Sequence, residues 1–186
     1  DSICYCDMAK LKVLSLSVRG LNSPAKRRAI HRSLRESESD VCLLQETHLL
    51  KRDWYRLRST HFSGQYFSSD STKTAGVAVL LSTRFGGQVE GVVVDIPGRL
   101  LAIRITWQAQ TLLVVSLYSL NERQEHFLRE AVGQVVACPC EDVLLGGSGG
   151  LQLGARYPLG PVSPEIRSGW CAFFGGERLA GRSGSF

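Results

Sequence analysis

Long hydrophobic runs are absent from the 186 residues of this sequence. No stretch approaches the roughly 20 apolar residues that a membrane-spanning helix needs. The first ten residues, DSICYCDMAK, lack the basic-then-apolar order of a secretion signal. These absences predict an intracellular protein, in the nucleus or the cytoplasm.

Cysteine pairs with the spacing of metal ligands are also absent. Cys4-x-Cys6 and Cys138-Pro-Cys140 lack the two-residue gap of a zinc knuckle, which argues against a zinc site. In a reducing compartment the cysteines are expected as thiols. Cys42 lies inside an apolar run and is expected in the core.

The composition itself is that of a folded, basic domain. Hydrophobic residues make up 44% of the chain and charged residues 21%, enough for one domain with a core of its own. Lysine and arginine outnumber acidic residues 22 to 17, which gives a formal charge of +5. This balance favours a polyanionic partner such as nucleic acid, although a merely basic surface would give the same number.

The first half of the chain reads as a β-α-β unit. Residues 11–18 are apolar and partly alternating, and a basic, helix-compatible stretch follows at 25–38. Ser23 and Pro24 suit the N-cap and first turn of that helix. Residues 40–46 then read as a buried strand that ends in a carboxylate.

Further strands and one more helix follow, separated by Gly, Pro and Ser. Apolar residues at helical spacing predict a helix over 122–136. The pattern predicts a layered α/β sandwich, in which ligands gather at strand ends. The additional strands are expected at 64–69, 76–82, 88–96, 99–107, 111–118 and 141–147.

The composition divides the chain into three parts. Residues 1–10 are interpreted as an N-terminal extension and residues 11–150 as the domain. Residues 151–186 are rich in glycine and proline and show no sustained period. They are predicted to form a poorly ordered tail.

Three polar residues at strand ends are candidate site residues. Glu46 could hold a divalent cation, since Mg²⁺ takes oxygen ligands; a solvated strand-end charge is the alternative. Tyr118 and Asn121 could hydrogen-bond a phosphate oxygen, although Tyr118 could equally cap the core. The four histidines show no metal spacing and are expected at the surface or with satisfied hydrogen bonds: His31, His48, His61 and His126.

The order and spacing of several motifs resemble the endonuclease/exonuclease/phosphatase family, most closely the endonuclease of LINE-type retrotransposons. The motifs are GLNSP, QETH, TAGVAVLLS, LLVVSLYSLN and VLLGGSGG. The resemblance implies a four-layer α/β sandwich that cleaves phosphodiester bonds in DNA with Mg²⁺, or Mn²⁺ in its place. It puts Glu46 on the family's metal-binding Glu, and Tyr118 and Asn121 on residues that contact the scissile phosphate.

Other family positions are changed in this chain. The first strand of the family ends in Asn-x-Asn or Asn-x-Asp, where this chain has Ser17 and Arg19. The family's Gly-Asp-Phe-Asn is GSGG here, so Ser148 replaces the Asp and Gly150 the Asn. No Ser-Asp-His signature follows Gly150, and we therefore expect the fold to lack its last strands and to leave an exposed sheet edge.

Two functional hypotheses follow from these changes. The chain is a Mg²⁺-dependent DNA endonuclease of retrotransposon origin, impaired or inactive in this copy. Alternatively, it is a non-catalytic remnant that binds DNA through the basic helix. The DNA contacts expected on that helix are Lys26, Arg27, Arg28, Arg32 and Arg35.

Overall fold

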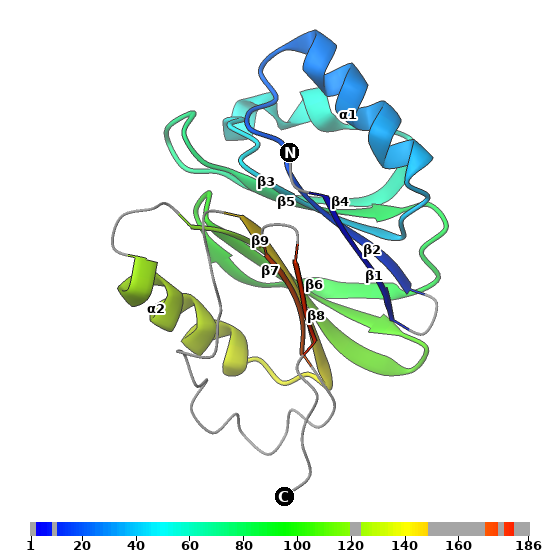
Figure 1. Cartoon of the computed structure of the whole chain (residues 1–186), viewed down its shortest axis with the longest axis vertical. Coiled ribbons are helices and arrows are strands. Elements are labelled where there is room, and N and C mark those ends of the chain that lie inside the picture. Colours follow the sequence, from blue (N-terminus) through cyan, green and yellow to red (C-terminus); the bar gives the residue numbers. More distant parts are fainter. Residues whose placement is uncertain (1–2, 9–10, 120–123, 149–169, 175–176, 181–186) are drawn as a thin grey trace, which may run out of the picture.

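The computed structural model describes residues 3–8, 11–119, 124–148, 170–174 and 177–180. Within these residues two mixed β-sheets pack face to face, and helices cover their outer faces (Figure 1). The elements in chain order are β1 Ile3–Met8, β2 Leu11–Ser17, α1 Pro24–Glu36, β3 Val41–Gln45, the 3₁₀ helix η1 Lys51–Leu57, β4 Phe62–Ser68, β5 Val77–Ser82, β6 Gln88–Ile96, β7 Leu100–Trp107, β8 Gln110–Tyr118, α2 Gln124–Val136, β9 Asp142–Ser148, β10 Trp170–Phe174 and β11 Glu177–Ala180.

Each sheet contains a parallel pair of strands joined by a helix, because parallel neighbours need a crossover connection. The first sheet has the order β1-β2-β3-β5-β4, and α1 joins the parallel strands β2 and β3. The second has the order β11-β10-β9-β8-β7-β6, and α2 joins β8 and β9. Ser17 lies opposite Gln45 in the first pair, and Tyr118 lies opposite Ser148 in the second.

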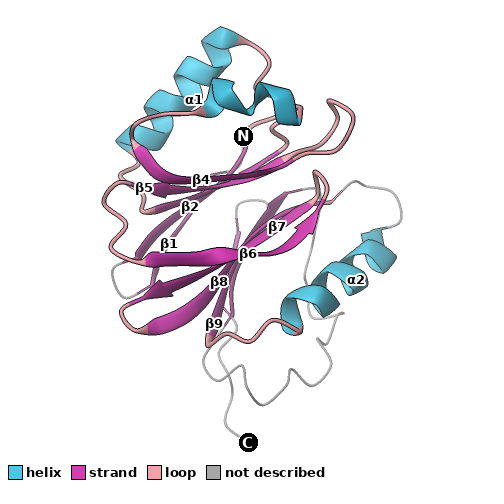
Figure 2. Ribbon diagram, turned by 180° about the vertical axis from the view of Figure 1, so that it is seen from behind, coloured by secondary structure: helices cyan, strands magenta, loops and turns pink. Residues whose placement is uncertain are grey.

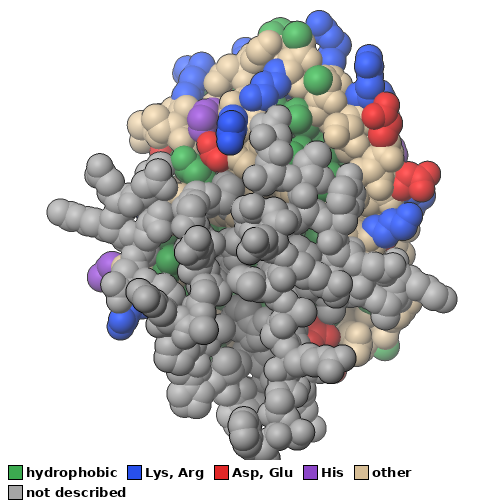
Figure 3. Space-filling model, viewed as in Figure 1, with side chains coloured by type: hydrophobic (Ala, Val, Ile, Leu, Met, Phe, Trp, Pro, Cys, Tyr) green, Lys and Arg blue, Asp and Glu red, His purple; other side chains and the backbone are tan. Residues whose placement is uncertain are grey.

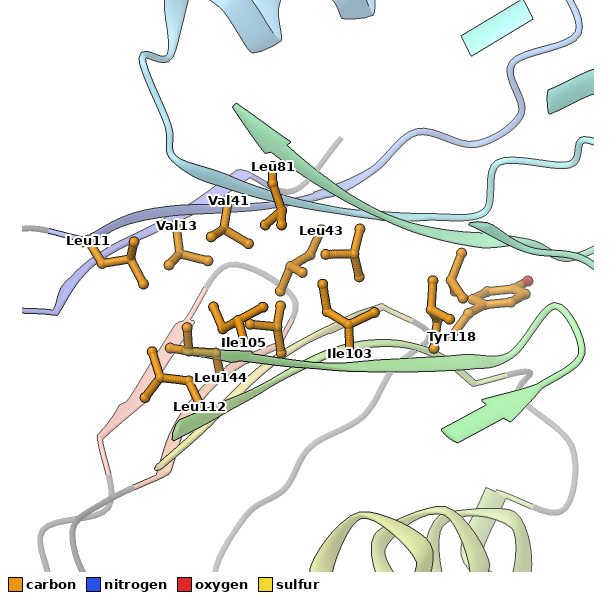
Figure 4. Close-up of a cluster of buried hydrophobic side chains, with 14 of the residues drawn as sticks. Leu11, Val13, Val41, Leu43, Leu81, Ile103, Ile105, Leu112, Tyr118 and Leu144 are labelled. Carbon is orange, nitrogen blue, oxygen red and sulfur yellow. The ribbon is translucent and has the colours of Figure 1, made fainter. Parts of the chain in front are cut away.

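The main core lies between the two sheets. Figure 4 shows side chains such as Val13 and Leu43 from the first sheet pointing toward Ile103 and Leu144 from the second. These four are buried, with at most 1% of their surface exposed. Full burial of one such side chain contributes about 1.5–3 kcal/mol. The strands are also covered on their outer faces, which explains why they read as near-continuous apolar runs.

Helices form the two outer layers (Figure 2). Ile30 and Leu34 of α1 pack with Leu57 of η1 on the first sheet. On the second sheet, α2 buries its apolar stripe, which includes Phe127 and Val135. The predicted four-layer α/β sandwich is therefore confirmed. None of the helices in the described part of the chain has the length and apolar character needed to span a membrane.

The predicted elements within the domain agree with the structure to within about two residues at most ends. Helix α1 begins at Pro24 after Ser23, although the Ser23 side chain makes no capping hydrogen bond. The 3₁₀ helix η1 was not predicted. Cys42 is fully buried, as its apolar neighbours predicted.

Two segments of the predicted tail form strands. Residues 170–174 pair in parallel with β9, and residues 177–180 pair with them. The second sheet therefore continues past β9, where an exposed edge was expected. Unpaired backbone groups at a sheet edge favour the addition of a strand, and the short apolar run WCAFF supplies one. Similarly, residues 3–8 of the predicted extension form β1 on the edge of the first sheet.

Candidate active site

Two loops run side by side past the ends of β2 and β3. Three backbone hydrogen bonds join them: Val18 N–H to Gln45 O at 2.9 Å, Gly20 N–H to Glu46 O at 2.6 Å and Leu21 N–H to Thr47 O at 2.8 Å. Three residues that are not glycine have left-handed backbone here, Arg19 (φ 44°), Glu46 (φ 58°) and His48 (φ 54°). Such conformations are uncommon and cluster at functional sites.

The Glu46 carboxylate lies against the end of the neighbouring strand. The hydroxyl of Ser17 donates a hydrogen bond to Glu46 Oε1, and Ser17 itself is only 7% exposed. The predicted metal ligand and one of the changed family positions are therefore in direct contact. Ser17 supplies a neutral oxygen beside a carboxylate oxygen.

A buried polar network supports this edge from inside the sandwich. The amide of Gln45 donates to Ser15 Oγ at 3.2 Å and to Ser116 Oγ at 3.3 Å. The Ser116 hydroxyl in turn donates to Leu44 O at 3.0 Å. Because Ser116 belongs to β8, this network ties the two sheets together directly beneath the strand ends.

Backbone hydrogen bonds continue from the first sheet to the second. Thr47 N–H donates to Gly76 O at 3.0 Å, Gly76 N–H to Gly98 O at 2.9 Å, and Tyr118 N–H to Arg99 O at 2.7 Å. Gly76 has a φ of +143°, and a Cβ there would lie 2.2 Å from Thr47 Oγ1. Glycine at this position thus allows a close approach of the backbone segments, which brings Glu46 and Tyr118 to the same end of the sandwich.

Tyr118 ends β8 with its side chain 8% exposed. Figure 4 shows its ring at one end of the interior cluster, with the hydroxyl directed away from the cluster. Burial raises the pKa of Tyr118, the charge of Glu46 raises it further, and the charge of Arg99 opposes both. The phenol therefore stays protonated at neutral pH and can donate a hydrogen bond.

Arg99, whose charge acts on the phenol of Tyr118, was not predicted from the sequence. Its guanidinium carbon lies 4.0 Å from the centroid of the Phe127 ring on α2. Its Nε and Nη2 are buried and have no hydrogen-bond partner among the described residues. The only signal in the sequence was its place after Gly98, in the turn between two strands.

Gly146, the first residue of GGSGG, has a packing role near the end of β9. A Cβ at Gly146 would lie 2.6 Å from both Leu43 Cδ1 and Ser15 Oγ of the facing sheet. Ser148 is the last residue of β9 and lies opposite Tyr118. The other two predicted positions, Asn121 and Gly150, lie outside the described residues.

Three of the four histidines differ from the expectation of surface or satisfied side chains. His126 is exposed, but one ring nitrogen in each of His31, His48 and His61 is buried without a hydrogen-bond partner in the described part of the chain. Burial and the charges of Arg35 and Arg27 lower the pKa of His31. These rings are therefore partly enclosed groups, although no such histidine was predicted.

The basic helix contains two kinds of cation. Lys26 Nζ donates to Arg19 O at 2.9 Å, and Arg27 Nη1 donates to Leu21 O at 2.8 Å, so both side chains hold the loop after β2. The exposed arginines of α1 follow at four- and three-residue spacing, which places them on one face of the helix. They are Arg28, Arg32 and Arg35.

The residues at this edge fit a divalent cation only in part. Glu46 and Ser17 offer a carboxylate and a hydroxyl oxygen, and Mg²⁺ is commonly held by one or two carboxylates with several waters. Among residues 11–119 and the other described segments, no group of three or more His, Cys, Asp or Glu side chains converges as a metal cage.

Two α/β layers pack face to face as a sandwich, and its strand ends bring together a carboxylate from one sheet and a phenol from the other. This arrangement is that of an α/β sandwich with its candidate site at the strand ends. The chain belongs to the Endonuclease/Exonuclease/phosphatase family, whose model matches residues 13–180. The match extends past Gly150, where the sequence motifs ended, and includes β10 and β11.

Individual relatives are distant. The chain is 28% identical over 153 residues to the "Transposon TX1 uncharacterized 149 kDa protein" of Xenopus laevis, which covers 78% of this chain and 11% of that protein. A structure of TDP2 from C. elegans has a TM-score of 0.51 at 18% identity, covering 67% of this chain and 43% of that one. The endonuclease domain of TRAS1, a telomere-specific non-LTR retrotransposon, has a TM-score of 0.46 at 16% identity, covering 66% and 52%.

Proposed function

We propose that this chain is a DNA-binding member of the nuclease-type family whose own phosphodiester hydrolysis is impaired or lost. One observation carries the proposal: β9 ends in Ser148 opposite Tyr118, where the family motif has an aspartate. A serine hydroxyl cannot act as a general base at neutral pH without a helper. Loss of a general base typically lowers the rate by about 10²–10⁴, and Gly150 offers no side chain at all.

The remaining residues can still bind a phosphodiester. Glu46, with Ser17 beside it, would hold Mg²⁺ or Mn²⁺, and such an ion when bound polarises a phosphoryl oxygen. Tyr118, kept protonated by its raised pKa, would donate its hydroxyl hydrogen to a phosphate oxygen. These groups position a phosphate, but none of them takes the proton from an attacking water.

DNA binding is assigned to the outer face of α1. Arg28, Arg32 and Arg35 are exposed on one face of the helix, and the described residues place no acidic side chain in an ion pair with them. Each cation that neutralises a phosphate releases counterions, so the affinity falls with salt. We assign Lys26 and Arg27 a supporting part, since both hold the loop beside Glu46.

The second candidate function is an active Mg²⁺-dependent endonuclease. The hydrogen bond between Ser17 and Glu46, and the electrostatic effect of Glu46 on Tyr118, favour it because both preserve a shared edge between the sheets. The chain spans 11% of the transposon protein, 52% of the TRAS1 endonuclease domain and 43% of the C. elegans TDP2 structure. Residues supplied by a longer protein could complete such a site.

A plasmid-nicking assay separates the two candidates. The purified chain is incubated with supercoiled plasmid and Mg²⁺, and Glu46→Gln serves as the matched control. We expect no nicking above that of the control. Nicking by the wild-type chain that disappears in Glu46→Gln would overturn the proposal that hydrolysis is impaired. It would establish the second candidate function, an active endonuclease. Restoring Ser17→Asn, Ser148→Asp and Gly150→Asn together is expected to leave the chain inactive, because the Ser-Asp-His signature is absent.

DNA binding is tested separately, without metal. Replacing Arg28, Arg32 and Arg35 by Gln should lower the slope of log K against log salt by up to about 0.9 for each phosphate that is no longer neutralised. A variant with Lys12→Gln and Arg84→Gln removes charge elsewhere and should keep the slope. Equal slopes for the wild-type chain and the arginine variant would exclude α1 as the DNA-binding face.

A further inference from the structure

The 3₁₀ helix η1 has a buried side and an exposed side that the site does not use. Leu57 and Asp53 are buried, and the ring of Trp54 lies 5.2 Å from that of Phe67 in β4. Side chains three residues apart eclipse one another in a 3₁₀ helix. Arg52 and Tyr55 therefore stand one above the other on the outer side, and Arg58 caps the end of the helix.

Tyr55 is held in an exposed position. Its side chain is 63% exposed, and Tyr55 and Val92 are the large hydrophobic residues exposed among those whose burial is described. Arg56 Nε donates to the Tyr55 hydroxyl at 3.2 Å, and the Arg56 guanidinium carbon lies 5.6 Å from the ring centroid. Arg56 also pairs with the buried Asp53 at 3.3 Å. The same arginine therefore links the exposed ring of Tyr55 to a buried residue of η1.

Three further cations lie at the two ends of η1. Lys51, Arg52 and Arg58 are exposed, and no described residue forms an ion pair with them. Asp53, the acidic residue within η1, is already paired with Arg56. Figure 3 shows lysine and arginine side chains over the layer that α1 and η1 form. We call Lys51, Arg52, Tyr55 and Arg58 the η1 platform.

We propose that the η1 platform binds a single-stranded or unpaired segment of nucleic acid, with Tyr55 stacked on a base and the three cations at phosphates. An exposed aromatic ring between cations suits this partner, because stacking needs a base face that a paired duplex does not offer. An acidic protein segment would be attracted to the cations but would leave the ring without a stacking partner. The inference rests on the proposed nucleic-acid function and names a strand-specific surface for it.

Fluorescence anisotropy with a short, labelled, mixed-sequence single strand in EDTA tests the platform. Tyr55→Ala should raise the Kd by about 5- to 150-fold, the range for removal of one base stack. Tyr55→Trp should bind like the wild-type chain, because it retains an aromatic face. Arg52→Gln should lower the salt slope by about 0.7, the value for one phosphate contact on a single strand.

Controls make each result decisive. Val92→Ala removes an exposed apolar side chain from β6, and Arg84→Gln removes a charge from another turn; both should bind like the wild-type chain. Unchanged binding by Tyr55→Ala, or an equal loss of affinity with a blunt duplex, would overturn the platform. Equal binding of polyglutamate would overturn it in favour of a general anion surface.

The two binding experiments together distinguish the η1 platform from the proposed duplex-binding face of α1. The salt-slope test of the α1 arginines uses duplex DNA, whereas the platform test uses a single strand without metal. Loss of single-strand binding in Tyr55→Ala with a normal duplex slope in the α1 variant would support the platform and reject the duplex face. The reverse result would reject the platform and leave the proposed function in place.

Discussion

The parallel strand pairs β2/β3 and β8/β9 carry different polar side chains at their ends. At the first sheet, the hydroxyl of Ser17 at the end of β2 contacts the carboxylate of Glu46, the residue after β3, and left-handed backbone surrounds them. At the second sheet, β8 and β9 end in Tyr118 and Ser148, so a phenol remains but no carboxylate stands at the last position of β9. The comparison teaches that two strand pairs of the same topology can carry different polar groups at their ends.

The frame is kept by packing that both edges share. The network of Gln45, Ser15 and Ser116 joins the sheets beneath the strand ends, and Leu43 of β3 fills the space that the missing side chain of Gly146 leaves in β9. None of these contacts needs an ionisable group. The packing that holds the strand ends therefore depends on none of the ionisable groups at the candidate site.

The largest expected effect comes from breaking that shared interior. Leu43 is fully buried between the sheets, and Leu43→Ala should lower the free energy of unfolding by about 2–5 kcal/mol, because it leaves a cavity. Urea denaturation monitored by fluorescence and circular dichroism measures this change. Both probes should shift together, since one interior supports both edges. Val92→Ala, at an exposed position, should stay within about 0.5 kcal/mol of the wild-type chain.

A smaller effect is expected from the opposite change at the same contact. Gly146→Ala puts a Cβ 2.6 Å from Leu43 Cδ1 and Ser15 Oγ, and overpacking of this kind costs about 1–3 kcal/mol. Urea denaturation again measures the effect. Gly86→Ala, where nothing lies within 4 Å of the new Cβ, is the matched control and should not destabilise the fold.

The double variant sharpens the comparison between the edges. Because the new Cβ at position 146 would partly fill the space left at position 43, Leu43→Ala with Gly146→Ala should cost less than the sum of the single changes. Strict additivity would contradict the contact and indicate that the two edges are held independently.

The sequence predicted the parts of this fold that depend on local pattern. Apolar runs predicted β2, β3 and β8, and helical spacing predicted α2, because burial on both faces or on one stripe leaves a periodic signal. Strand β10 was missed because WCAFF is a short run in a glycine-rich segment, and its pairing with β9 depends on a distant sheet edge. Helix η1 was missed because 3₁₀ geometry has little sequence signature.

The candidate site could be predicted only residue by residue. Glu46 and Tyr118 were found because each follows a buried strand. The position of these residues relative to one another and to Ser17 was not predicted, because it depends on contacts between residues far apart in the chain. Ser17 and Glu46, for example, are 29 positions apart. The backbone bonds through Gly76 and Gly98 likewise leave no pattern beyond a glycine at each turn. The roles of these residues and of the α1 arginines stay predictions.

The smallest expected effect tests whether the two edges meet electrostatically. Glu46, from the first sheet, raises the pKa of Tyr118, from the second, in addition to the larger effect of burial. Glu46→Gln should therefore lower the pKa of Tyr118, and Arg99→Gln should raise it. Absorbance of the phenolate, taken as the difference from Tyr118→Phe, isolates this one tyrosine.

The sign of the accompanying stability change follows from the direction of the shift. Since the folded state holds the Tyr118 proton more tightly than the unfolded chain, its contribution to stability is present below the ordinary pKa of 10.0 and is lost as the pH rises through the raised value. Tyr118→Phe should lose less stability than the wild-type chain over that alkaline range, and in Glu46→Gln the loss should be smaller and should end at a lower pH. An unchanged Tyr118 titration in Glu46→Gln would contradict an electrostatic interaction between the two residues, and with it a single site shared by the two sheets.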